Sequence, residues 1–345
     1  MYAGVICAGQ ERDVCTVNIT QRKRSACHKP AVLALVLTFV ILLAGCTGGA
    51  STTAESAETT PLSAETSETS ATAETTASDP EGMPYTNWTV NSQGSIQWRD
   101  PAPAAITLDT SRILSITIPE GYNLVDICKL LEKKGVQTFY HTFSAALAGD
   151  YPDLDILDDA RAADHRRYIL DGYLFPDTYQ FYVGESPNSI FTKFLNRTSQ
   201  VLAAYAPPAG MSMDDVINLA SLIEEEAASG SRAEVSSVLH NRLEAGMLLE
   251  LDMTINYVEW YIKPLVVSEN TSEINAWNAY YNTYKATCPG LPAGPITNPG
   301  LLAIEAALAP ATTDYLFFVT DDAGKYYFAA TYDEHLANIE AIRNS

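Results

Sequence analysis

Residues 212–228 read SMDDVINLASLIEEEAA, and the helix they predict positions the most informative side chain of the sequence. Ser212 and Asp215 have the spacing of a capping box, so we expect a helix from Met213 to about Ala228. At about 100° per residue, four apolar side chains fall on one side of this helix. They are Val216, Leu219, Leu222 and Ile223.

The helix ends in three glutamates, and only Glu226 lies on the apolar side. Glu225 points about 100° away toward solvent, and Glu224 lies nearly opposite Glu226. Three glutamates at a helix end are most often a solvated acidic patch. Here, however, they oppose the helix dipole, and one of them faces the interior, where loss of water raises the pKa of a carboxyl. Because a glycosidic general acid needs a raised pKa, Glu226 is the candidate catalytic residue.

Around this helix the sequence predicts an α+β fold. Helices and strands mix without the βαβα regularity of a parallel α/β sheet. The expected elements are a strand at 113–118, helices at 124–134, 138–147, 189–205, 233–245 and 300–309, a hairpin at 315–320 and 326–330, and a closing helix from 333. Residues 288–300 form a long Pro/Gly-rich loop.

The N-terminal 45 residues are typical of an export signal. Basic residues at Arg22, Lys23 and Arg24 precede an apolar run at 31–44, which is short for a membrane span. The run ends in LAGC at 43–46, which resembles a bacterial lipobox and predicts lipidation of Cys46; a short transmembrane anchor is the alternative. Residues 46–110 are predicted to be a disordered tether, because the Ser/Thr/Ala/Glu-rich stretch that begins it cannot bury enough apolar surface. We therefore expect a lipid-anchored protein on the extracytoplasmic face of the cell membrane.

The bulk composition excludes some functions. The formal charge of −21 argues against a nucleic-acid partner, which requires clustered Lys and Arg. The five histidines show no metal-ligand spacing. Cys128 and Cys288 could pair in an oxidising compartment, but two buried free thiols are the favoured interpretation.

Several short motifs, in their order and spacing, resemble the YceG-like family of endolytic murein transglycosylases, also called the MltG family. The resemblance runs from about Ile116 to the C-terminus. Its motifs are DGYLFPDTY (171–179), LASLIEEE (219–226), VLHNRL (238–243), LDMT (251–254), YNTY (281–284), GLPAGPI (290–296), NPG (298–300) and YLFFV (315–319). The resemblance implies a small LysM-like β-α-α subdomain at 111–170 and a mixed α+β catalytic domain at 171–345.

The resemblance also implies a reaction. The family's catalytic acid is the second Glu of a Glu-x-Glu pair, which falls on Glu226, with Glu224 as its supporting partner. Such enzymes cut the β-1,4 bond between MurNAc and GlcNAc and leave a 1,6-anhydro end. One carboxylate suffices, because the sugar's own hydroxyl attacks intramolecularly. No metal or cofactor is implied. The expected partners are peptidoglycan glycan strands and, less directly, peptidoglycan synthases.

Polar and aromatic side chains within the motifs are candidates to line the sugar cleft. They are Asn241, Arg242, Asp252, Asn282, Tyr284 and Asn298. A helix-surface role for the pair at 241–242, and a core or turn role for 281–284, are equally open alternatives. The chain departs from the family pattern at Met253, where a proline is usual, and in its lipobox, where a transmembrane anchor is usual.

Two other functions remain as alternatives. A non-catalytic, peptidoglycan-binding scaffold lipoprotein would keep the fold without cutting, and Met253 mildly favours it. A solute-binding lipoprotein would also combine a lipobox with a tether, but it needs two lobes of regular βαβ alternation, which the sequence lacks.

Overall fold

The computed structural model describes residues 88–90, 96–98, 104–228, 230–265 and 271–344. The predicted export signal and Cys46 lie outside the described residues, as does most of the predicted tether. Within the tether, β1 (Trp88–Val90) pairs with β2 (Ile96–Trp98) in an antiparallel ribbon. Residues 46–110 are therefore not all without secondary structure; the compositional bias that predicted disorder stops at Met83. Within the described ranges, none of the helices combines the length and apolar character needed to cross a bilayer.

A small unit begins the folded part. Strand β3 (Asp109–Thr117) leads into α1 (Leu124–Lys133) and α2 (Phe139–Ala148), both close to their predicted bounds. Each helix begins at a side-chain cap: Asn123 accepts the N–H of Asp126, and Thr138 accepts that of His141. A short 3₁₀ turn at Asp155–Leu157 and α3 (Asp158–Ala162) follow.

The strand that completes this unit was not predicted. β4 (Thr178–Val183) pairs antiparallel with β3, with Ile116 opposite Tyr179. Its side chains alternate between exposed and buried, as a half-buried strand requires. The sequence here shows an aromatic-rich run in which that alternation is easily overlooked. The predicted division at residue 170 thus separates β3 from the strand with which it pairs.

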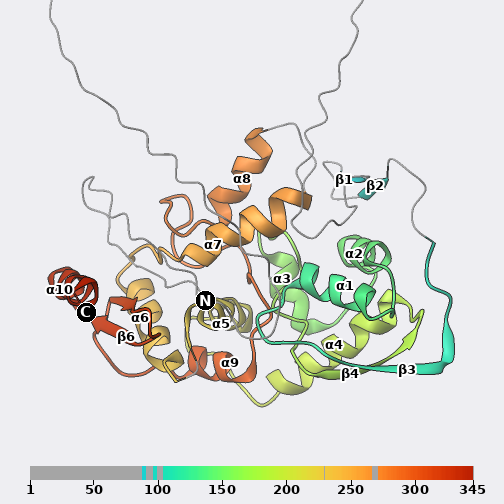
Figure 1. The fold of residues 1–345 in the computed structure, drawn as a ribbon, viewed down its shortest axis with the longest axis horizontal. Coiled ribbons are helices and arrows are strands. Elements are labelled where there is room, and N and C mark those ends of the chain that lie inside the picture. Colours follow the sequence, from blue (N-terminus) through green and yellow to red (C-terminus); the bar gives the residue numbers. More distant parts are fainter. Residues whose placement is uncertain (1–87, 91–95, 99–103, 229, 266–270, 345) are drawn as a thin grey trace, which may run out of the picture. The chain divides into compact units, whose positions relative to one another are not determined.

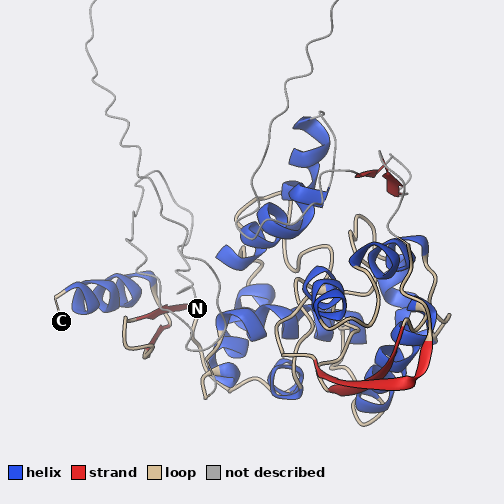
Figure 2. Cartoon of the chain, turned by 45° about the vertical axis from the view of Figure 1, so that its right-hand side comes forward, coloured by secondary structure: helices blue, strands red, loops and turns tan. Residues whose placement is uncertain are grey.

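The remaining chain is mostly helical, with one more hairpin, and the α+β class is confirmed (Figure 2). The helices are α4 (Pro187–Leu202), α5 (Met213–Glu226), α6 (Arg232–Glu244), α7 (Asp252–Tyr257), α8 (Thr271–Tyr281), α9 (Leu301–Leu308) and α10 (Tyr332–Arg343). A π-helical turn at Val258–Ile262 and a 3₁₀ turn at Lys263–Leu265 extend α7. The predicted hairpin is confirmed as β5 (Phe317–Thr320) and β6 (Tyr326–Ala329).

Helix α5 lies among α6, α7 and α9 and is buried on nearly every side (Figure 1). Its capping box is present as predicted, but the expected solvent-facing side is not. Asp214 is buried in an ion pair with Arg166 at 2.6 Å, and Asn218 donates to the carbonyl of Pro292 at 2.7 Å. Periodicity gives the angles between side chains on a helix, whereas the neighbouring elements decide which of them meet water. The polar side of α5 is thus covered by other protein groups.

The predicted Pro/Gly-rich loop covers one side of α5. The N–H of Ile296 donates to the hydroxyl of Ser221 at 3.1 Å, so the loop is bonded to the helix. The backbone of Gly172 packs closely against both the helix and this loop. At its φ of +90°, a Cβ there would stand 2.6 Å from side-chain atoms of Ile217 and Pro295. Only glycine fits this turn without strain. Cys128 and Cys288 are both buried free thiols, as the sequence favoured.

Candidate active site

Glu226 is the last residue of α5, and its side chain is only 3% exposed. Neither carboxyl oxygen makes a hydrogen bond of normal geometry with the residues that the structure describes. Most buried polar groups are paired, so an unpaired buried carboxyl is costly to folding and requires an explanation. The inward position predicted from helix periodicity is confirmed.

The surroundings of Glu226 favour its neutral form. Burial is the largest cause and raises the pKa of Glu226 to about 8, followed by the negative charges of Asp252 and Glu225. The backbone N–H of Met253 acts weakly in the opposite direction. A carboxyl with this pKa holds its proton at neutral pH and is suited to donate it to a leaving group.

Asp252 comes from α7, which packs against α5. The hydroxyl of Tyr284 donates to Oδ1 of Asp252 at 2.7 Å, and burial raises the pKa of Tyr284. Thr283 binds the start of the same helix, where its hydroxyl accepts the N–H of Leu251 at 2.9 Å. Two predicted residues, Asp252 and Tyr284, are therefore brought to Glu226 from separate motifs.

The end of α5 is held by a tyrosine of the C-terminal hairpin. The hydroxyl of Tyr326 donates to the backbone carbonyl of Glu226 at 2.6 Å and accepts the N–H of Ala228 at 2.9 Å. These bonds satisfy backbone groups that a helix end leaves open. They also fix where the Glu226 side chain leaves the helix.

Glu224 has a structural role on the other side of α5. Its carboxylate pairs with Arg232 at 3.3 Å and accepts the N–H of Gly300 at 3.2 Å, at the start of α9. These contacts join α5 to α6 and α9. Glu224 therefore supports the packing of the helix that carries Glu226, and the charge next to Glu226 on this helix is that of Glu225.

The model of the YceG-like family matches residues 99–341. The chain belongs to the YceG-like family.

Two curated relatives carry the name endolytic murein transglycosylase. The one from Bacillus subtilis is 34% identical over 239 residues, which cover 66% of this chain and 64% of that protein. The one from Streptococcus pneumoniae D39 is 29% identical over 253 residues, covering 68% of this chain and 45% of that protein. The match thus spans less than two thirds of either relative. A crystal structure of a YceG-like protein from Listeria monocytogenes aligns with a TM-score of 0.49 at 30% identity, covering 65% of this chain and 75% of that one.

Other residues of the YceG-like motifs serve the interior. Arg242 is fully buried; it donates to the carbonyl of Leu316 at 2.6 Å and pairs with Glu250 at 3.2 Å. Asn298 is also fully buried, where it accepts the N–H of Leu174 at 2.8 Å. Side chains so placed hold strands and turns together.

Asn241 and Asn282 are likewise engaged with backbone. The amide of Asn241 donates to the carbonyls of Thr313 and Tyr315 at 3.0 and 2.9 Å, and so holds the segment before β5. Asn282 is buried and accepts the N–H of Tyr284 at 3.0 Å within a turn. The turn alternative for 281–284 therefore describes Asn282, whereas Tyr284 reaches Asp252.

Sequence reasoning missed Tyr326. It lies 100 residues from Glu226 along the chain, in a hairpin whose pattern gives no sign of that contact. Glu225 was placed in solvent, yet it is half-buried and its charge acts on Glu226. Both contributions depend on tertiary packing.

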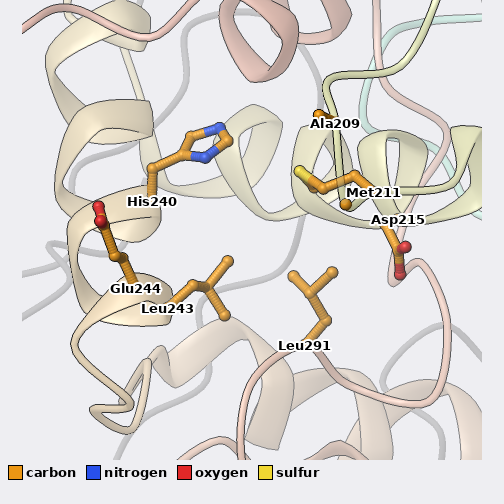
Figure 3. Close-up of a pocket in the computed structure, with 8 residues that line it drawn as sticks. Ala209, Met211, Asp215, His240, Leu243, Glu244 and Leu291 are labelled. Carbon is orange, nitrogen blue, oxygen red and sulfur yellow. The ribbon is translucent and has the colours of Figure 1, made fainter.

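Two surface hollows lie away from Glu226. One, of about 530 Å³, is lined by Ala209, Gly210, Met211, Asp215, His240, Leu243, Glu244 and Leu291 (Figure 3). It adjoins the first turn of α5, whereas Glu226 is at the last turn. The other, of about 310 Å³, is lined by residues of β3, β4 and α4, among them Ile113 and Lys193. Neither hollow is lined by Glu226.

Proposed function

We propose that this YceG-like protein is an endolytic peptidoglycan lytic transglycosylase that cleaves the β-1,4 bond between MurNAc and GlcNAc. The observation that carries the proposal is the buried Glu226 carboxyl, whose pKa of about 8 keeps it protonated at neutral pH. Only a group that still holds its proton can act as the general acid. The names of the two curated relatives support the same substrate, the murein glycan strand.

The reaction needs a single carboxyl that works twice. Glu226 first gives its proton to the glycosidic oxygen as the bond from that oxygen to C1 of MurNAc breaks. The resulting carboxylate then takes the proton of the C6 hydroxyl of the same MurNAc, whose oxygen bonds to C1. Glu226 is protonated again, the product ends in 1,6-anhydro-MurNAc, and no water is consumed. Intramolecular attack takes the place of a second catalytic carboxylate.

The other residues of the site assist this cycle. Asp252 repels the negative form of Glu226 and so favours return of the proton. Tyr326 fixes the backbone from which Glu226 projects. Of the predicted sugar-lining residues, Asp252 and Tyr284 are the two whose placement beside Glu226 supports contact with substrate.

Two further parts of the chain belong to the proposal. The order β3–α1–α2–β4 supports a LysM-like subdomain, a small module suited to hold a glycan strand. The lipobox at Cys46 and the polar stretch after it support a lipid-anchored protein on the outer side of the cell membrane, close to peptidoglycan synthases. The tether would let the folded part reach into the wall.

The test is to digest purified peptidoglycan with the protein and to examine the released glycans by mass spectrometry. The wild-type protein should produce internal cuts with anhydro-MurNAc ends, and Glu226→Gln should produce none while remaining folded. Glu244→Gln, an exposed position on α6, is the matched control and should cut normally. Binding of glycan strands by wild type without any anhydro product would favour the scaffold alternative. Full activity of Glu226→Gln would refute the assignment of the catalytic residue.

A further inference from the structure

Asp171 is a fully buried carboxyl that the proposed reaction does not use. The N–H of Leu124, at the start of α1, donates to its Oδ1 at 2.6 Å. The hydroxyl of Tyr257, at the end of α7, donates to its Oδ2 at 2.6 Å. The two oxygens of one carboxyl thus join the small N-terminal unit to the helix that carries Asp252.

The backbone of Asp171 is tied to α5 as well. Arg166 donates to the carbonyl of Asp171 at 2.7 Å and, with its other terminal nitrogen, to Asp214 at 2.6 Å. Asp214 lies in the first turn of α5, the helix that ends in Glu226. Residue 171 is therefore bonded to three helices: directly to α1 and α7, and through Arg166 to α5.

Helix α7 is held at both ends. Tyr257 fixes its last residue to Asp171, and Thr283 fixes its start by bonding the N–H of Leu251 and the hydroxyl of Thr254. A helix of six residues is only about 9 Å long, so it moves as one rigid piece. Asp252 is its first residue, so a shift of this helix would move Asp252 relative to Glu226.

We propose that the buried Asp171–Tyr257 pair is a positioning element of the active site, which fixes α7 so that the Asp252 carboxylate faces Glu226. The proposal rests on the proposed function for its kinetic consequences, but the placement of Asp252 can be tested without turnover. Neither residue of the pair touches the sugar. Their effect on the reaction passes through Asp252.

The proposal predicts the direction in which the pKa of Glu226 must change when α7 is released. Glu226 is faced by Glu225 from α5, Asp252 from α7, Tyr284 from the segment after α8, and Tyr326 from β6. If α7 is released, the repulsion from Asp252 weakens, so the pKa of Glu226 falls. Asp171 itself responds in the opposite sense. Burial raises its pKa to about 7, and the hydrogen bond from Tyr257 counteracts this, so removing that hydroxyl raises the pKa of Asp171 further.

The test variant is Tyr257→Phe in the full chain, which removes one hydroxyl and keeps the ring. The matched control is Tyr179→Phe, since the hydroxyl of Tyr179 is also buried and donates at 2.6 Å, but to the carbonyl of Phe175. Two readouts are compared: the pH profile of kcat/KM for glycan cleavage, and an infrared titration of the carboxyl band that disappears in Glu226→Gln. For Tyr257→Phe we expect kcat/KM to fall about tenfold, and the pH above which kcat/KM declines to be lower by about half a pH unit or more.

Asp252→Asn provides the reference, because it removes the repelling charge itself. Asp252→Asn should lower the pKa of Glu226. Adding Tyr257→Phe should lower this pKa no further, since both changes act through the same carboxylate. The proposal would be overturned if the two substitutions shifted the pKa of Glu226 additively, or if Tyr257→Phe raised this pKa. It would also be overturned if Tyr257→Phe behaved like the Tyr179→Phe control. If Tyr257→Phe does not fold, Asp171→Leu replaces it, because it removes the acceptor of the Tyr257 hydroxyl at similar side-chain volume. If wild type makes no anhydro product, the proposed function fails, and the infrared titration still decides the positioning proposal.

Discussion

Replacing Glu226 by Gln should make the protein inactive and, as pH rises, increasingly more stable than wild type. Gln has nearly the same shape, so the substitution removes the ionisable group from the buried site without opening a cavity. The carboxyl has an ordinary pKa of 4.5 in the unfolded chain and about 8 in the folded protein. The folded state thus binds this proton more tightly than the unfolded state does.

The sign of the effect follows from where the proton is held. Below pH 4.5 the carboxyl is protonated in both states, and the group imposes no penalty. Between pH 4.5 and 8 the unfolded chain releases the proton while the folded protein keeps it, so stability falls as pH rises. At about 1.4 kcal/mol per pKa unit, the difference between 4.5 and about 8 corresponds to about 5 kcal/mol lost above pH 8.

The assay is urea unfolding of wild type and Glu226→Gln at pH 5 and at pH 8, in the same buffer and salt. Gln introduces its own cost, since its amide also lacks a partner, but that cost does not depend on pH. Relative to wild type, the free energy of unfolding of the variant should increase by about 3.5 kcal/mol between pH 5 and pH 8. Titrating groups that do not interact with Glu226, including Asp171, contribute equally to both proteins and cancel. A constant difference between the two proteins across this range would refute the buried, protonated carboxyl.

Three further substitutions separate structural from catalytic roles. Arg242→Met should lower the free energy of unfolding by about 3–5 kcal/mol, because it leaves Glu250 buried without its partner, while KM of the folded enzyme stays unchanged; a raised KM with normal stability would restore the substrate-binding role. Tyr326→Phe should cost about 1–2 kcal/mol in urea unfolding and also lower kcat, because both bonds at the end of α5 are lost; unchanged kcat would contradict this. Gly172→Ala should destabilise by at least about 1–3 kcal/mol in thermal unfolding, from its φ of +90° and the overlap with Ile217; an unchanged melting temperature would argue against this close approach.

Local signals in the sequence predicted much of this protein. The capping box at Ser212, the 3.6-residue period that turns Glu226 inward and the ranges of α1 and α2 depend on residues within a few turns of each other. Such local interactions depend little on distant segments, and the structure contains these elements. The motif order from Ile116 onward likewise gave the family, because it requires only order and spacing.

Contacts between distant segments were decided by the tertiary structure alone. The sequence offered Arg242 and Asn298 as candidates to line a sugar cleft, and folding buries both against backbone groups more than 70 residues away. It left Tyr326 unnoticed and could not tell which acid would face Glu226. The pKa of a carboxyl depends on how much water and which charges surround it, and those are supplied by α7 and the C-terminal hairpin. Helix periodicity therefore determined that Glu226 faces inward, whereas the packing of distant elements determined that it meets Asp252 there and holds its proton.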